Sequence, residues 1–336
     1  MTIAETTSPT EVTERVAGDI TALIGGTPLV DLSRYAENRA LGARLLGKAE
    51  FLNPAGSVKD RVAWSIIRDG EETGELRAGD LIVDITSGNT GIALAAIAAS
   101  RGYRTKFYLG DNTSPDKHRI LEALGAELID VPNSLFLDPE GVERLFARAE
   151  EENPGAFIAN QLGNPANPRV HRETTGPEIW ADTAGAVDIL VAGVGTGGTV
   201  SGAGGFLKER KPTVRVVVTE PGDRSVPTED EVYPDEIDGV HKVWDVEPDL
   251  LPPNFDADVV DEVVAVEAAE AYAAARALLR EEGLFVGASA GAILHAATVI
   301  AGRPENAGAT IVVILPDTGE RYLSAGVFEI TRGAGG

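Results

Sequence analysis

The stretch VDILVAGVGTGGT, residues 187–199, joins an apolar run directly to a turn rich in glycine. Consecutive positions of this run are apolar, as they are in TIVVIL at 310–315, and such continuity is typical of strands buried on both faces of a parallel sheet. Further strand-like runs alternate with alanine-rich helical segments, at 81–85, 106–109, 127–131 and 214–219. This alternation predicts an α/β fold with a mostly parallel sheet that helices cover.

The composition narrows the classes of function. The 336 residues suffice for one large domain or two medium ones. The chain has no cysteine, which excludes disulfides, zinc-thiolate sites, iron–sulfur clusters and thiol nucleophiles. Its formal charge of −24 disfavours nucleic acids and anionic membranes, because such partners are bound through Lys and Arg. We therefore expect no nucleic-acid partner and no membrane partner.

The sequence predicts neither a targeting signal nor a metal site. Residues 1–15 are polar and acidic without an apolar centre, which does not fit a secretory signal, so we expect a cytoplasmic protein. Two uncharged stretches, 189–207 and 284–302, contain too many small residues beside turn signals to predict membrane helices. We predict no metal site, because no metal-binding spacing relates the four histidines, His118, His171, His241 and His295.

Four glycine-rich turns carry the polar residues that could perform chemistry. The first is NPAGSVKDR at 53–61, in which Ser57 is the expected N-cap of a helix that begins at about Val58. Lys59 then lies in the first helical turn, where the partial positive charge of the helix terminus lowers the pKa of an amine and favours its nucleophilic form. A solvated surface lysine is the alternative that this motif leaves open.

The second turn, TSGNTG at 86–91, follows the strand-like run LIVDI and precedes an apolar helix. Its hydroxyls, its amide and its free backbone N–H groups are donors that can bind a small anion such as a carboxylate. An ordinary capped turn needs one such side chain, whereas this turn has four within five positions. We therefore expect an anion site here.

The third turn, GVGTGGT at 193–199, fits the pattern G-x-G-x-x-G. Glu220, at the end of the next strand, stands where a dinucleotide site has its ribose ligand, so a nicotinamide-dependent dehydrogenase is a competing interpretation. The additional glycine and the hydroxyl groups make this turn tighter and more polar than a dinucleotide-binding turn needs to be. A single phosphate fits this turn better.

The fourth turn, GASAG at 287–291, follows an apolar run at 284–286 that we predict to be a strand, and it matches the nucleophile pattern G-x-S-x-G. A serine hydrolase of that type needs an acid and then a histidine after the nucleophile. The only later histidine, His295, lies six residues beyond Ser289 in the same predicted helix, so the triad cannot form. Helix capping is the other role open to Ser289.

Taken together and in this order, these motifs resemble the pyridoxal-phosphate enzymes of the tryptophan-synthase β-subunit fold type, and most closely the cysteine synthase group. The resemblance extends from about residue 24 to about residue 328. Seven stretches carry it: IGGTPLV at 24–30, NPAGSVKDR at 53–61, TSGNTGIALA at 86–95, NPANPRVHRETTGPEIW at 164–180, GVGTGGT at 193–199, GASAGA at 287–292 and LPDTGERYLS at 315–324.

The resemblance implies fold type II, with two three-layer α/β/α domains on mostly parallel, twisted sheets. Residues 1–44 would pack on the large domain, residues 45–157 would form a small mobile domain, and residues 158–336 would form the large C-terminal domain. A homodimer is the implied assembly.

The resemblance also implies the site. Lys59 would form the Schiff base with pyridoxal 5′-phosphate, Asn89 would contact the ring hydroxyl, and Ser289 would contact the ring nitrogen. A serine there leaves the nitrogen unprotonated, which makes the cofactor a milder electron sink. The cofactor phosphate would lie on Gly195, Thr196, Gly197, Gly198 and Thr199. The substrate carboxylate would bind Thr86, Ser87, Thr90 and Gln161.

The implied activity is β-replacement on an activated L-serine, either O-acetylserine or O-phosphoserine, with sulfide to give L-cysteine by β-elimination and then β-addition. Homocysteine giving cystathionine, and an amine giving 2,3-diaminopropionate, are alternatives within the same fold. A nicotinamide-dependent dehydrogenase and an inactive binding module are less favoured alternatives.

One departure from the cysteine synthase pattern concerns the substrate. Where that group has Gly-Ile-Gly, this chain has Gly239, Val240 and His241, which adds bulk and a titratable ring at the mouth of the implied site. We expect His241 to contact substrate and, when cationic, to attract an anionic group, with the neighbouring Lys242 adding charge.

Overall fold

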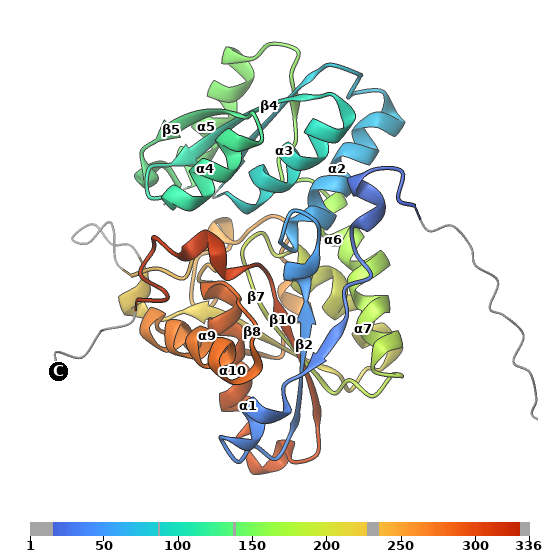
Figure 1. Ribbon diagram of the computed structural model, residues 1–336, viewed down its shortest axis with the longest axis vertical. Coiled ribbons are helices and arrows are strands. Elements are labelled where there is room, and N and C mark those ends of the chain that lie inside the picture. The colour runs from blue at the N-terminus through green and yellow to red at the C-terminus, as the bar shows by residue number, and fades with distance from the viewer. Residues whose placement is uncertain (1–15, 87, 137–138, 227–234, 330–336) are drawn as a thin grey trace, which may run out of the picture.

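Two sheets organise the computed structural model, which describes residues 16–86, 88–136, 139–226 and 235–329 (Figure 1). The larger sheet has the strand order β1-β2-β10-β7-β8-β9. Its neighbouring strands are parallel, apart from the antiparallel pair β1 and β2. The bounds are β1 Leu29–Asp31, β2 Arg44–Ala49, β7 Ile189–Gly193, β8 Arg215–Pro221, β9 Glu262–Val266 and β10 Thr310–Leu315.

The smaller sheet has the order β5-β4-β3-β6 and is parallel throughout. Its strands are β3 Leu81–Thr86, β4 Arg104–Gly110, β5 Glu127–Val131 and β6 Phe157–Ile158. We call this sheet with its helices the small unit, and the six-stranded sheet with its helices the large unit.

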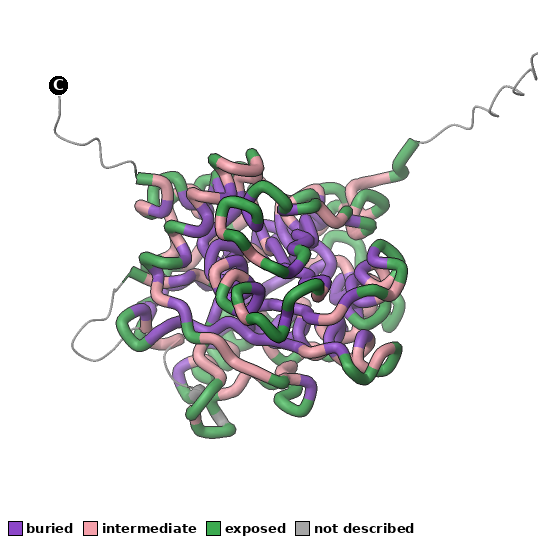
Figure 2. The backbone as a smooth tube through the Cα atoms, turned by 90° about the horizontal axis from the view of Figure 1, so that it is seen from below, coloured by how far each residue is buried: buried purple, intermediate pink, exposed green. Residues whose placement is uncertain are grey.

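Helices cover both faces of each sheet. In the large unit, Ile311 and Val313 of β10 pack in one apolar core with α1, α9 and α10, whereas Val312 and Ile314 pack in another core with α7 and α8. The buried segments accordingly run through the interior of the molecule, with the exposed segments outside them (Figure 2). The helices of the large unit are α1 Ser33–Glu37, α7 Gly176–Asp182, α8 Gly205–Arg210, α9 Ala268–Glu282 and α10 Ala288–Ala301.

The small unit has the same layering. Ile82 of β3 packs with α2, α3 and α4, and Val83 packs on the opposite face with α5. The remaining helices are α2 Lys59–Thr73, α3 Asn89–Arg101, α4 Pro115–Ala123, α5 Pro139–Glu152 and α6 Ala166–Val170. Two π-helical turns, η4 His171–Thr175 and η5 Val200–Gly204, come directly before α7 and α8. The predicted α/β class and the two three-layer arrangements are confirmed.

Two sequence predictions are wrong in detail. The apolar run at 284–286 is not a strand, because Val286 makes only an isolated bridge to Thr318. The predicted domain boundary at residue 45 falls inside β2, which pairs along its whole length with β10 and so belongs to the large unit. Hydrophobic patterning cannot distinguish these cases, since the partner strand decides which sheet a strand joins.

A buried charge network joins the start of α2 to the large unit. The guanidinium of Arg61 donates to Glu50 at 2.8 Å and to Glu178 at 2.7 Å, and Lys48 donates to Glu178 at 2.7 Å. Burial alone would raise the pKa of the Glu50 carboxyl, but the adjacent Arg61 outweighs that effect and lowers it. Every charge in the interior of this network therefore has a partner of opposite sign.

We predict that Arg61→Met destabilises the protein by about 3–5 kcal/mol, because it leaves Glu50 charged and unpaired in the interior. Urea unfolding followed by circular dichroism measures this loss. The control is Arg44→Met, which removes an exposed pair with Asp31 and should cost about 0–1 kcal/mol. Equal losses in the two variants would contradict the prediction.

Candidate active site

Asp317 lies where three of the four glycine-rich turns meet. It follows β10 directly, is fully buried, and forms a bridge with Ser57 of the first turn. Its carboxylate accepts from Nδ2 of Asn89 in the second turn at 2.7 Å, and its carbonyl accepts from the N–H of Gly287 in the fourth turn at 3.1 Å. The carboxyl end of β10 therefore brings together residues that are more than 200 positions apart in sequence.

Lys59 begins α2 beside this junction. Its backbone N–H donates to Oγ of Ser57 at 3.2 Å, so Ser57 caps the first turn although the helix begins one residue later than predicted. No hydrogen bond or ion pair joins Nζ of Lys59 to the part of the chain that the structure describes. Burial lowers the pKa of the Lys59 ammonium, and the carboxylates of Asp317 and Asp238 oppose that shift. This is the environment of an amine that can act as a nucleophile or a base.

The second turn, which we call the 86–90 loop, presents donors at the end of β3. Thr90 donates through Oγ1 to the side-chain oxygen of Gln161, and both residues are buried. Oγ1 of Thr86 accepts from the N–H groups of Gly88 at 3.1 Å and Gly91 at 3.4 Å, which leaves its hydroxyl hydrogen free to bind an anion. The structure thus brings Thr86, Thr90 and Gln161 together, whereas Ser87 lies outside the described residues.

The third turn, which we call the 193–199 loop, follows β7 and is closely packed. A Cβ atom on Gly198 would lie 1.9 Å from Oδ1 of Asn167, and one on Gly197, whose φ is +84°, would lie 2.6 Å from Phe255. Asn167 also donates to Oγ1 of Thr196 at 2.8 Å. Glycine is therefore required at these positions because other parts of the chain occupy the space of a side chain.

His171 supports the same loop from behind. Its Nε2 lies 3.2 Å from Oγ1 of Thr199, and its Nδ1 lies 2.8 Å from Oγ1 of Thr175. Burial, together with the charge of Arg61, lowers the pKa of His171 to about 3, so the ring stays neutral near pH 7. Sequence reasoning assigned no role to His171 or Asn167, although both lie in the quoted stretch 164–180.

Ser289 is the second residue of α10 and is buried. It makes no capping hydrogen bond, and its hydroxyl has no hydrogen-bond partner among the described residues. Nε2 of His295, the histidine of this helix, lies 3.9 Å from Oε2 of Glu270. Its imidazole is therefore beside a carboxylate and is not the base that a nucleophilic Ser289 would need. The geometry therefore excludes both the capping role and the hydrolase arrangement for Ser289.

Two charged residues have structural partners. Oε2 of Glu220, the ribose ligand of the competing dehydrogenase interpretation, accepts from the backbone N–H groups of Val243 and Trp244, both at 2.9 Å. Lys242 pairs with Asp223 and does not add charge beside His241. These contacts depend on how the 235–244 segment folds back on β8, which no local pattern indicates.

His241 is exposed, but its backbone is fixed by an N–H donated to the carbonyl of Val194 at 2.7 Å. Desolvation of its ring lowers the pKa of the imidazole, an effect that the carboxylate of Asp238 opposes. A cationic His241 is thus less favoured near pH 7 than the sequence suggested.

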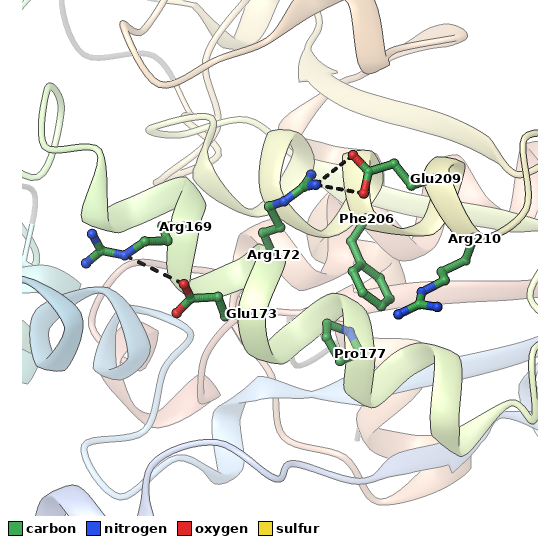
Figure 3. A pocket seen from close by; sticks show the side chains of 7 residues that line it. All are labelled: Arg169, Arg172, Glu173, Pro177, Phe206, Glu209 and Arg210. Atoms are coloured by element: carbon green, nitrogen blue, oxygen red, sulfur yellow. Dashed lines mark hydrogen bonds and ion pairs between the residues drawn. The ribbon is translucent and has the colours of Figure 1, made fainter.

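Other features do not compete with this site. Among the described residues, no group of three or more His, Asp and Glu side chains could hold a metal ion, and no described helix is both long and apolar enough to cross a membrane. An open depression of about 770 Å³ between α6, α7 and α8 contains none of the predicted site residues (Figure 3). Its Arg172 is paired with Glu209 at 2.6 Å, and Arg210 lies over Phe206.

We predict that Lys59→Ala abolishes turnover, with a loss of at least about 10³-fold, and removes the visible absorption of a cofactor bound through this amine. The fold should remain, because the Lys59 amine has no structural partner among the described residues. Circular dichroism and absorbance spectra test this. The control is Lys106→Ala, which breaks a 3.0 Å ion pair with Glu127 between β4 and β5 of the small sheet. Retained activity in Lys59→Ala would contradict the assignment.

Comparison with known proteins agrees with this geometry. The chain is 40% identical to cysteine synthase A of Escherichia coli (strain K12) over 324 residues, which cover 94% of this chain and 96% of that protein. It is 39% identical to cystathionine beta-synthase of Apis mellifera over 95% of this chain, and spans 64% of that longer protein.

Among solved structures, O-ureido-L-serine synthase gives a TM-score of 0.83 at 40% identity, covering 96% of this chain and 98% of that one. A cysteine synthase from Entamoeba histolytica gives 0.82 at 37% identity, covering 97% and 95%. The sequence model of the pyridoxal-phosphate dependent enzyme family matches residues 20–317 of this chain. The chain therefore belongs to the pyridoxal-phosphate dependent enzyme family and is an enzyme of the cysteine synthase type.

Proposed function

We propose that this enzyme makes L-cysteine from an activated L-serine, O-acetylserine or O-phosphoserine, and sulfide. The observation that carries the proposal is the position of Lys59: an amine of lowered pKa near Asp317, the residue at which the first, second and fourth glycine-rich turns meet. The 40% identity to cysteine synthase A over most of the chain supports the same reaction.

The residues present fit pyridoxal 5′-phosphate. The 193–199 loop contains the glycines that a closely approached phosphate needs, together with the hydroxyl groups of Thr196 and Thr199. In the proposal, Lys59 binds the cofactor covalently, Gly195, Thr196, Gly197, Gly198 and Thr199 hold its phosphate, and Asn89 and Ser289 contact its ring. When bound, the cofactor supplies an electron sink for negative charge at the substrate Cα.

The remaining residues bind and orient the substrate. In the proposal its carboxylate binds at Thr86, Thr90 and Gln161, with Ser87 as a fourth proposed ligand, and the free hydroxyl hydrogen of Thr86 is a donor to it. This fixes the Cα–H bond toward Lys59, whose neutral amine removes the proton and holds it at Nζ. The hydroxyl of Ser289 offers a hydrogen bond to a neutral ring nitrogen, which favours elimination over wider carbanion chemistry.

Three alternative nucleophiles within the same fold are specific enough to test. The similarity to cystathionine beta-synthase raises homocysteine as the nucleophile, and the similarity to O-ureido-L-serine synthase raises hydroxyurea. An amine giving 2,3-diaminopropionate is a further candidate.

We also propose that the enzyme is a homodimer in the cytoplasm. Light scattering after size-exclusion chromatography tests the assembly, and cell fractionation tests the location.

A substrate panel tests the reaction. The purified enzyme is given O-acetylserine or O-phosphoserine, each with sulfide, homocysteine, ammonia or hydroxyurea, and products are measured by mass spectrometry. We expect kcat/KM with sulfide to exceed that with each other nucleophile by at least about tenfold. A preference for another nucleophile with both donors would replace the proposed function.

His241 provides a prediction about selectivity. Because its exposed ring adds volume beside the 193–199 loop, His241→Gly should improve homocysteine relative to sulfide by roughly tenfold, with little effect on the half-reaction with the donor. Stopped-flow absorbance separates the two half-reactions. The matched control is Lys242→Gly, since its ammonium is engaged with Asp223. Equal selectivity in both variants would place His241 outside the site.

A further inference from the structure

An ion pair with one fully buried partner crosses from the small unit to the large unit beside the candidate site. Lys117, in the first turn of α4, has a side chain with no solvent exposure, and its ammonium pairs with the carboxylate of Asp238. The ammonium also lies 4.8 Å from the centre of the Tyr322 ring. The two charges come from elements that are 121 positions apart.

The stem of Lys117 supports the 86–90 loop. Gly88 has a φ of +121°, and a Cβ atom at this position would lie 2.5 Å from Cδ of Lys117. The backbone of the loop therefore rests directly on the methylene groups of Lys117. Any displacement of this lysine removes the surface that supports the loop.

The other end of the pair is tied to the 193–199 loop. Ile237 and Val240, on either side of Asp238, are buried in the core of the large unit. Between them, the carbonyl oxygen of Gly239 lies 2.7 Å from the place that a Cβ atom of Gly195 would occupy. Asp238 is thus held on a segment that contacts the proposed phosphate loop.

Neighbouring contacts dock the same turn of α4. Ser114 donates through Oγ to the carbonyl of Arg321 at 2.9 Å, and Asp116 accepts from the backbone and hydroxyl of Ser324 at 2.8 and 2.7 Å. These contacts are exposed or partly buried, whereas the Lys117 side chain is completely enclosed. Lys117 is therefore the fully enclosed charge of this junction.

Enclosing the Lys117 ammonium costs desolvation energy that its attraction to the partly exposed Asp238 carboxylate often fails to offset, so the pair is weak evidence for stability and better evidence for a fixed arrangement. We propose that Lys117 is a positioning residue: through Asp238 it fixes the 86–90 loop relative to the 193–199 loop, so that the amino-acid donor binds with full affinity only when this pair is formed. The inference rests on the proposed function only for the identity of the donor.

Four variants separate positioning from simple charge burial. Lys117→Met keeps the stem and removes the charge, Asp238→Asn removes the other charge, and the double variant removes both without leaving an unpaired ion. Lys117→Arg keeps the charge. The control is Lys208→Met, which breaks a 2.7 Å pair with Asp261 before β9.

Three measurements are made on each holoenzyme: the dissociation constant of O-acetyl-L-serine, by absorbance titration without sulfide; hydrogen–deuterium exchange of the peptide containing Gly88; and the urea midpoint. We expect both single variants to weaken donor binding by at least about tenfold and to speed exchange at Gly88, with Lys117→Arg and Lys208→Met within about threefold of the parent.

The double variant decides whether Lys117 positions the loops, even if one of the single variants does not fold. We expect its urea midpoint to return toward that of the parent while donor binding stays weak and exchange stays fast. Recovery of donor affinity and slow exchange in the double variant would overturn the proposal, as would an unchanged Lys117→Met. Failure of the parent to bind O-acetyl-L-serine would count against the proposed function alone, because the exchange measurement does not depend on the donor.

Discussion

The carboxylate of Asp317 fixes the geometry on which the site depends. It is fully buried and accepts from Asn89 at 2.7 Å and from the hydroxyl of Tyr322 at 2.5 Å. Its backbone contacts Ser57 of the first turn and Gly287 of the fourth turn. A buried carboxylate must have such donors, because an unpaired charge in the interior is very costly. The need to satisfy this one group therefore holds three turns of the site in place.

The electrostatics of the cleft separates structural cations from a reactive one. Arg61, Lys48 and Lys117 are all buried, and each is paired with a carboxylate. Lys59 lies near Asp317 and Asp238, its amine has no hydrogen bond to the described residues, and burial lowers the pKa of that amine. Because the amine of Lys59 has no hydrogen-bond partner among the described residues, burial makes it lose its proton more readily than an exposed lysine would.

The two units have different relations to the site. The large unit provides β7, β10 and the start of α10, and it also reaches into the first residues of α2 through Glu50 and Glu178. The small unit provides the 86–90 loop and α4. Polar contacts between residues far apart in sequence join the units, and domain interfaces of this polar kind permit relative motion. The substrate binding that we propose at the 86–90 loop would therefore favour one relative arrangement of the units.

The sequence by itself determined the parallel α/β class, the strands at 127–131 and 310–315, and the position of Lys59 at the start of a helix. These features follow from apolar runs, glycine turns and capping residues, which are local properties of a chain. Only the tertiary structure decided that β2 joins the large sheet, that His171 and Asn167 support the 193–199 loop, and that Asp317 and the Lys117–Asp238 pair connect the turns. Each of these depends on a partner remote in sequence, and burial of a polar group selects that partner only once the sheets have packed.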